Sequence, residues 1–229
     1  MKCIAHRGCS AAGTPENSLA AVQAAVELGV DGIEVDLWFL HGQFWVFHDR
    51  RLRFYDNHRI DELTYLELSQ LRLDNGEPLA SLDSILKAVN GNCLLNLEIK
   101  NSGGAEVLAQ TIDNVCRELQ LTQEHLIISS FNHLELYACR KLLPDIKIGV
   151  LLAGLPLSYA ALAEPLAPFS FNTHIDLTTI ELIADIHARG MESWVYTANF
   201  IDEWTELKRW RADAVFTDHA QKLMCFNER

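Results

Sequence analysis

Reactive side chains stand at the ends of apolar runs in two separate parts of the sequence. His6 and Arg7 follow the first such run, at residues 2–5, and Glu34 and Asp36 lie inside the second. Side chains of a β-strand alternate between its two faces, so Glu34 and Asp36 are expected to project to the same side. Two carboxylates a few ångströms apart repel each other unless a cation lies between them. A hard divalent metal ion is the simplest such cation, and the pair therefore predicts a metal site.

Glu98 and Lys100 repeat the same two-residue spacing at the end of a later apolar run. A third carboxylate and a positive charge would then share one face of a strand. Taken separately, Glu98 and Lys100 are also explained by ordinary cross-strand ion pairs, and Glu34 and Asp36 by solvated carboxylates. Together the carboxylates predict an oxygen-only site for one divalent cation, Mg²⁺ or Ca²⁺, since zinc prefers nitrogen and sulfur ligands.

Two histidines could supply acid and base to this site. His6 and His48 each follow an apolar strand candidate, and imidazoles can transfer protons near neutral pH. Arg7 offers a planar fork that suits phosphate oxygens, although an ion pair with Glu16 is a competing explanation, and Lys100 offers a point charge. A metal, two cations and two histidines predict metal-assisted cleavage of a phosphoester, and the pattern leaves open which histidine is the acid.

The elements that would position these side chains alternate between strand and helix. Strand candidates lie at residues 2–5, 32–39, 44–48, 93–100, 126–130, 146–152, 169–172, 193–197 and 214–217. Helix-period segments lie at residues 19–28, 81–89, 105–118, 133–143, 178–189 and 202–211. This rhythm predicts an α/β fold, a (β/α)₈ TIM-type barrel. A doubly wound sheet is the alternative, but no Gly-rich nucleotide loop follows the first strand.

One strand candidate is surplus to an eight-stranded barrel. Too few residues separate Phe39 from Phe44 for a parallel crossover, so these runs are expected to form an antiparallel hairpin that turns at His41-Gly42. Such a turn would bring His48 back towards the carboxylates. Residues 49–79 are expected to form a small insertion on the C-terminal face, with a short helix at 64–71.

Thr14-Pro15 predicts the start of the first helix, with Thr14 as the cap and Pro15 as the first helical residue.

Composition and charge limit the partners. The chain has 229 residues, 49% hydrophobic and 22% charged, and its formal net charge is −12. Phosphate backbones are bound through clustered Lys and Arg, so we expect no nucleic-acid partner and instead a small-molecule substrate. Length and the lack of a linker predict a single domain over 1–229, with the insertion at about 49–79.

Cysteine usage and apolar segments bear on location. The six cysteines are dispersed and form no CxxC pair, which favours reduced thiols and a cytoplasmic protein. No secretory signal is recognised at the N-terminus. The longest uncharged stretch, residues 148–163, contains Pro156 and is short for a bilayer, so no stable membrane insertion is expected. The oligomeric state is left open.

The motifs resemble those of the glycerophosphodiester phosphodiesterase family. They match in family order over nearly the whole chain: His6-Arg7-Gly8, Pro15-Glu16-Asn17-Ser18, Gly32-Ile33-Glu34-Val35-Asp36, His48-Asp49, Leu97-Glu98-Ile99-Lys100, Ile128-Ser129-Ser130-Phe131 and Phe216-Thr217-Asp218. The resemblance implies a barrel with a small insertion, and hydrolysis of glycerophosphodiesters to sn-glycerol 3-phosphate and an alcohol. It also implies these roles: metal ligands Glu34, Asp36 and Glu98; acid/base pair His6 and His48; phosphate contacts Arg7 and Lys100; substrate contacts Phe131 and Tyr196.

Three segments depart from the family pattern. The usual Arg-Thr-Thr after His-Asp is replaced around Phe54-Tyr55, and the usual Pro-Thr-Leu reads Ala80-Ser81-Leu82. The usual Trp-Thr-Val-Asn reads Tyr196-Thr197-Ala198-Asn199, which keeps an aromatic wall of another size. The alcohol specificity is therefore left open.

Two rival functions are considered. The apolar residues 150–163 suggest cleavage of lysophospholipids, although a loop and helix packed on the barrel also explain them. A binding module that holds a phosphorylated ligand without turning it over is the second rival. Attack by the neighbouring glycerol hydroxyl, through a cyclic phosphate, and direct attack by water are both open.

Overall fold

The computed structural model describes residues 1–11, 13–53 and 55–228. Within these residues, eight parallel strands form a closed ring: β1 (Lys2–Ala5), β2 (Gly32–Leu40), β7 (Leu94–Ile99), β8 (Leu126–Ser130), β9 (Lys147–Leu152), β10 (Ser170–His174), β11 (Glu192–Tyr196) and β12 (Ala214–Thr217). Each strand pairs with its neighbour, and β1 pairs with both β12 and β2. The TIM-type barrel is confirmed, and the doubly wound sheet is wrong because this last pairing closes the ring.

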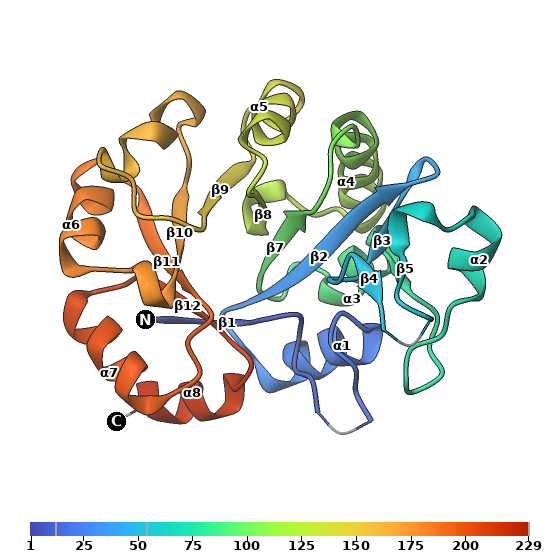
Figure 1. Ribbon diagram of the computed structural model, residues 1–229, viewed down its shortest axis with the longest axis horizontal. Coiled ribbons are helices and arrows are strands. Elements are labelled where there is room, and N and C mark those ends of the chain that lie inside the picture. Colours follow the sequence, from blue (N-terminus) through green and yellow to red (C-terminus); the bar gives the residue numbers. More distant parts are fainter. Residues whose placement is uncertain (12, 54, 229) are drawn as a thin grey trace.

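Helices form an outer layer around the strands (Figure 1). They are α1 (Leu19–Leu28), α3 (Leu82–Val89), α4 (Ala105–Leu119), α5 (His133–Leu142), α6 (Ile180–Ala188), α7 (Ile201–Trp210) and α8 (Ala220–Asn227). In α3 the buried residues Leu82, Ile85, Leu86 and Val89 follow helical spacing and form one apolar stripe. After β9 the connection is a 3₁₀ stretch, Tyr159–Leu166, which contains Pro165. None of the described helices has the length and apolar character needed to cross a bilayer.

The expected hairpin is present. β3 (Gln43–Val46) runs antiparallel to β2, and the last pair, Leu40 with Gln43, leaves His41-Gly42 as a two-residue turn. Both turn residues have positive φ, 52° and 80°, as the tight turn of a twisted hairpin requires. The N–H of Phe47 donates to the carbonyl of Asp36 at 3.0 Å, so the chain returns to the carboxylates as expected.

The insertion has an apolar cluster of its own. It contains β4 (Arg51–Leu52), β5 (His58–Arg59) and α2 (Tyr65–Gln70), and β6 (Ala80–Ser81) then pairs with β3. Leu52, Ile60 and Leu68 are fully buried against Trp38 and Trp45 of the hairpin. Figure 1 shows α2 beside the hairpin, at the edge of the barrel. Of the departure around Phe54-Tyr55, Phe54 lies outside the described residues.

The expected start of α1 is wrong. The helix begins at Leu19, and its cap is Ser18, whose hydroxyl accepts from the N–H of Ala21. Thr14 instead bridges to Ala11, so Pro15 precedes the helix. Asn17 adopts a left-handed φ of 59°, which an α-helix cannot include. The residue takes this conformation because its side chain bonds Asp36 on β2.

Candidate active site

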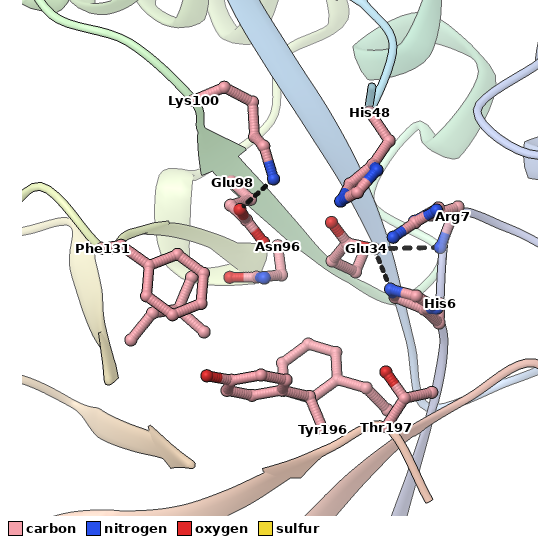
Figure 2. Close-up of a pocket in the computed structure, with 12 residues that line it drawn as sticks. His6, Arg7, Glu34, His48, Asn96, Glu98, Lys100, Phe131, Tyr196 and Thr197 are labelled. Carbon is pink, nitrogen blue, oxygen red and sulfur yellow. Dashed lines mark hydrogen bonds and ion pairs between the residues drawn. The ribbon is translucent and has the colours of Figure 1, made fainter. Parts of the chain in front are cut away.

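A pocket of about 180 Å³ lies at the C-terminal end of the barrel strands (Figure 2). Its lining includes every predicted site residue except the buried Asp36: His6, Arg7, Glu34, His48, Glu98, Lys100, Phe131 and Tyr196. The barrel interior around Phe216, which also lines the pocket, is filled by Ile4, Ile127 and Trp194. The parallel strands therefore bring together side chains from most of the length of the chain at one mouth.

The three carboxylates converge. Glu34 and Asp36 lie on β2, Glu98 lies on the neighbouring strand β7, and Asp36 is directly opposite Glu98 in the strand register. One oxygen of each carboxylate lies within 4.8 Å of the other two. Glu34 and Asp36 are only 2% and 1% exposed. The strand alternation inferred from the sequence is thus sufficient to build an acidic cluster.

Burial and mutual repulsion disfavour the ionised form of the carboxylates in this cluster. Burial raises the pKa of Glu34 well above its ordinary value, and the charges of Asp36 and Glu98 raise it further. Burial and Asp36 also raise the pKa of Glu98, against the opposing charge of Lys100. Burial acts on Asp36 in the same direction, but Lys100 and other nearby cations outweigh it and hold the pKa of Asp36 below its ordinary value.

Each carboxylate is held in a defined orientation. The Asp36 carboxylate accepts a hydrogen bond from Asn17 Nδ2 at 2.8 Å, and the Asp36 N–H donates to Asn17 Oδ1 at 3.1 Å. Glu34 Oε2 accepts from the N–H of Arg7 at 2.9 Å. Glu34 Oε1 is buried and has no hydrogen-bond partner among the described residues. An oxygen-only donor set with one uncommitted buried oxygen fits Mg²⁺ or Ca²⁺.

The two cations reach the cluster from β1 and β7, the strands on either side of β2. Lys100 Nζ lies 2.6 Å from Glu98 Oε1 and 3.1 Å from Asp36 Oδ1. Arg7 pairs with Glu16 at 2.8 Å, the competing explanation considered above, and its Nε lies 3.3 Å from Asp36, while the side chain still lines the pocket. Position 8, directly after Arg7, requires a glycine, because its φ is 80° and a Cβ there would lie 2.7 Å from the backbone of Ala21.

Each histidine pairs with a carboxylate through its Nδ1. His6 Nδ1 lies 2.7 Å from Asp218 Oδ1, and His48 Nδ1 lies 2.7 Å from Asp49 Oδ1. His6 Nε2 lies 4.0 Å from Glu34 Oε2, so this nitrogen faces the acidic cluster. A carboxylate that accepts from Nδ1 fixes the ring and leaves Nε2 for proton transfer.

Aromatic and apolar side chains form the opposite wall of the pocket (Figure 2). The rings of Phe131 and Tyr196 meet edge to face, with centroids 5.8 Å apart. The hydroxyl of Tyr196 donates to the carbonyl of Leu152 at 3.0 Å, and Leu151 lines the same wall. Tyr196 therefore offers the pocket its ring while its hydroxyl is committed to the backbone.

Sequence reasoning gave no role to several residues that the structure brings to the site. Asp49 and Asp218 hold the histidines, Asn17 holds Asp36, and Asn96 lines the pocket. The first three lie inside the motifs quoted above, which was the available signal. Asn96 precedes Glu98 by two residues and so shares its face of β7.

Comparisons with known proteins agree with this geometry. The model of the Glycerophosphoryl diester phosphodiesterase family matches residues 6–222. A glycerophosphodiester phosphodiesterase of Caldanaerobacter subterraneus subsp. tengcongensis is 31% identical, over 96% of this chain and 95% of the relative. The structure of an Oleispira antarctica phosphodiesterase in complex with the product sn-glycerol-3-phosphate has a TM-score of 0.87 at 27% identity, covering 100% of this chain and 97% of that one.

A glycerophosphodiester phosphodiesterase structure from Parabacteroides distasonis has a TM-score of 0.83 at 25% identity, covering 100% of this chain and 98% of that one. These matches extend over the whole barrel, including the segments that carry the pocket. The resemblance inferred from the motifs is confirmed, as is the expectation of an enzyme over a binding module. The chain belongs to the glycerophosphoryl diester phosphodiesterase family.

Proposed function

We propose that the chain hydrolyses glycerophosphodiesters to sn-glycerol 3-phosphate and an alcohol. The observation that carries this proposal is the convergence of three carboxylates, two cations and two carboxylate-held histidines around one pocket. The relative from Oleispira antarctica, whose structure holds sn-glycerol-3-phosphate, supports the same product here.

A divalent cation, Mg²⁺ or Ca²⁺, is proposed as the cofactor. Glu34, Asp36 and Glu98 would hold it, because their oxygens lie within 4.8 Å of one another and Glu34 Oε1 has no partner among the described residues. When bound, the ion supplies positive charge that polarises the phosphodiester and neutralises charge that develops during cleavage.

The phosphate would also contact the protein's own cations. Lys100 and Arg7 line the pocket and carry positive charge next to the carboxylates. Lys100 offers a compact donor at the pocket surface, and its Nζ also pairs with Glu98 and Asp36. Arg7 already pairs with Glu16, so its guanidinium contributes mainly through its charge and by holding Asp36.

His6 and His48 are proposed as the acid/base pair. With Nδ1 committed to a carboxylate, each ring can exchange a proton at Nε2. One imidazole accepts the proton of the attacking hydroxyl, from the glycerol or from water, and the other donates a proton to the leaving alcohol. A cyclic glycerophosphate trapped during turnover would identify the glycerol hydroxyl as the nucleophile. The alcohol is proposed to lie against Phe131 and Tyr196.

A substrate panel tests the proposal. Purified protein is stripped with a chelator, reconstituted with Mg²⁺ or Ca²⁺, and assayed with sn-glycero-3-phosphocholine, sn-glycero-3-phosphoethanolamine and bis(p-nitrophenyl) phosphate. We expect sn-glycerol 3-phosphate from the first two only when a divalent ion is present. Turnover that persists in the chelator, or the absence of turnover on every glycerophosphodiester, would contradict the proposal.

Cleavage of lysophospholipids remains the second candidate. Leu151 lines the pocket, and Leu155 and Leu157, on the loop that follows β9, are 45% and 106% exposed. An acyl chain on the glycerol could leave the pocket along these side chains. Adding 1-acyl-lysophosphatidylcholine to the panel tests this, since a higher kcat/KM for the acylated substrate would favour it over the first candidate.

A further inference from the structure

A hydrogen-bonded relay joins the ends of three barrel strands behind His6. His6 follows β1, Asp218 follows β12, and Asn199 lies just beyond β11. His6 Nδ1 lies 2.7 Å from Asp218 Oδ1, and Asn199 Nδ2 donates to Asp218 Oδ2 at 2.7 Å. The main-chain N–H of Asp218 donates to Asn199 Oδ1 at 2.8 Å. Both carboxylate oxygens of Asp218 are therefore occupied by fixed partners.

The orientation of the Asn199 amide follows from these partners. A main-chain N–H can only donate, so the Asn199 atom that faces the N–H of Asp218 must be its oxygen. The hydroxyl of Thr217 donates to the same oxygen at 3.0 Å. The amide NH₂ of Asn199 must then face the carboxylate of Asp218. The backbone of Asn199 is itself held, because its N–H donates to Glu203 Oε2 of α7 at 2.7 Å.

We propose that Asp218 and Asn199 are positioning residues that fix the tautomer of His6. An ionised carboxylate can only accept, so Nδ1 of His6 carries the proton and Nε2 is presented, with its lone pair, towards the pocket. The inference rests on the proposed acid/base role of His6 and takes His6 as the base of the pair, for which Nε2 must carry a lone pair. It extends that role by naming what keeps the imidazole in its reactive form.

The contacts of Asn199 determine which way the new amide of Asp218→Asn must face. Asn199 still offers its NH₂ to residue 218, so the new amide must turn its oxygen towards Asn199. Its own NH₂ then faces Nδ1 of His6, which must accept. The ring proton moves to Nε2, and the nitrogen that faces the pocket loses its lone pair. We expect kcat to fall by about 10²–10⁴-fold, the range for a lost general base or a wrong tautomer.

Exchanging the two side chains should reverse this effect. In the double variant Asp218→Asn with Asn199→Asp, the carboxylate at 199 accepts from the N–H of residue 218 and from the new amide's NH₂. The oxygen of that amide then faces His6 Nδ1 again and restores its proton. We expect kcat to recover at least about tenfold relative to Asp218→Asn alone, although the negative charge now lies one residue farther away. A purely structural role for Asp218 predicts no such recovery.

The control is a histidine–carboxylate pair outside the pocket. His174 Nδ1 lies 3.5 Å from the Asp176 carboxylate, whose side chain is 81% exposed, but this nitrogen accepts the main-chain N–H of Asp176 at 3.2 Å, so the carboxylate does not set the tautomer of His174. Asp176→Asn makes the same chemical change without reaching His6, and we expect it to leave kcat within about twofold. Melting temperature and its rise with Mg²⁺ report whether each variant is folded and retains the acidic cluster.

The test measures kinetics and tautomer together. Each variant is assayed with sn-glycero-3-phosphocholine, and its ¹⁵N-histidine spectrum reports which nitrogen of His6 is protonated, with His6→Gln identifying the signal. We expect Asp218→Asn to lower kcat with KM changed by less than about threefold, and to move the proton to Nε2. If the proton stays on Nδ1, or the double variant fails to return it there, the proposal is overturned. If the proton moves while kcat is unchanged, the tautomer assignment stands and the proposed role of His6 fails.

Discussion

Neutralising Glu34, one of the proposed metal ligands, is expected to make the metal-free protein more stable. In Glu34→Gln the buried carboxylate becomes an amide, whose oxygen can still accept from the N–H of Arg7. The NH₂ of the new amide can face the carboxylates of Asp36 and Glu98, which in the parent protein repel the Glu34 carboxylate. The folded protein thus loses an unfavourable buried charge and gains a hydrogen-bond donor. The unfolded chain loses only a solvated charge, so the substitution favours the folded state.

The sign of the pH dependence follows from the raised pKa of Glu34. Below its ordinary pKa of 4.5 the group is protonated in both the folded and the unfolded chain and contributes nothing. Above that value the unfolded chain ionises first, so the folded state loses stability by about 1.4 kcal/mol for each pH unit until the raised pKa is passed. Glu34→Gln removes this slope. The difference between variant and parent should therefore appear only as the pH rises above 4.5.

The size of the effect can be estimated from the burial of the group. An unsatisfied buried polar group costs about 1–3 kcal/mol. In a chain of 229 residues each kcal/mol corresponds to about 2–4 °C, so the metal-free variant should melt about 2–12 °C higher near pH 8. Mg²⁺ at a hundredfold excess over its Kd stabilises the parent by about 2.7 kcal/mol, or about 5–11 °C. The variant lacks one of the three proposed ligands and should gain much less, so Mg²⁺ should reduce or reverse the difference in melting temperature between variant and parent.

Scanning calorimetry measures the melting temperatures of the variant and the parent under four conditions: in a chelator and in Mg²⁺, each at about pH 4 and about pH 8. The exposed residue Glu27 of α1 offers a control, since Glu27→Gln makes the same change away from the cluster. A metal-free Glu34→Gln protein that melts lower than the parent near pH 8 would refute the argument from burial and repulsion. An undiminished response to Mg²⁺ would show that Glu34 is not a ligand.

Five further substitutions, at four residues, separate the roles of the other pocket residues. His6→Ala and His48→Ala should each lower kcat by about 10²–10⁴-fold while leaving the Mg²⁺-induced rise in melting temperature intact; retained turnover in both would remove the acid/base assignment. Lys100→Met should weaken competitive inhibition by sn-glycerol 3-phosphate at least about tenfold, because a charge-assisted contact is lost, and an unchanged Ki would exclude Lys100 from the phosphate site. Tyr196→Phe should keep kcat/KM within about threefold, since its hydroxyl bonds the Leu152 carbonyl, whereas Tyr196→Ala should raise KM; equal effects of the two would mean that the hydroxyl contacts the substrate.

The sequence was sufficient for the features that depend on local periodicity. Alternation along two strands put Glu34, Asp36 and Glu98 on inward faces, and the barrel rhythm made those faces meet. The short spacing around His41-Gly42 was enough to predict the hairpin that returns His48. In these cases the number of residues between two positions decides the geometry.

Features that depend on contacts between distant segments were not predictable in this way. Asp218 reaches His6 because β12 pairs with β1, and Asn199 reaches Asp218 because β11 ends beside β12. The start of α1 was misjudged because Asn17 leaves helical geometry to bind Asp36, a contact that Thr14-Pro15 does not reveal. The helix α8 was missed entirely, since residues 220–227 bury only Ala220 and Leu223 and carry a faint apolar stripe.

One face of the hairpin that carries His48 packs against a core separate from that of the barrel. Trp38 and Trp45 belong to the small cluster of the insertion, whereas Phe44 and Val46, on the other face of β3, belong to the large core of the barrel and its helices. Two cores of unequal size can open at different free energies, and the smaller one opens more readily. His48 follows this hairpin, so a transient opening of the insertion would remove the support of His48 on one side while the barrel stayed intact. The working temperature range of the enzyme would then be set by a few tryptophan and leucine contacts at its edge, not by the melting of its scaffold.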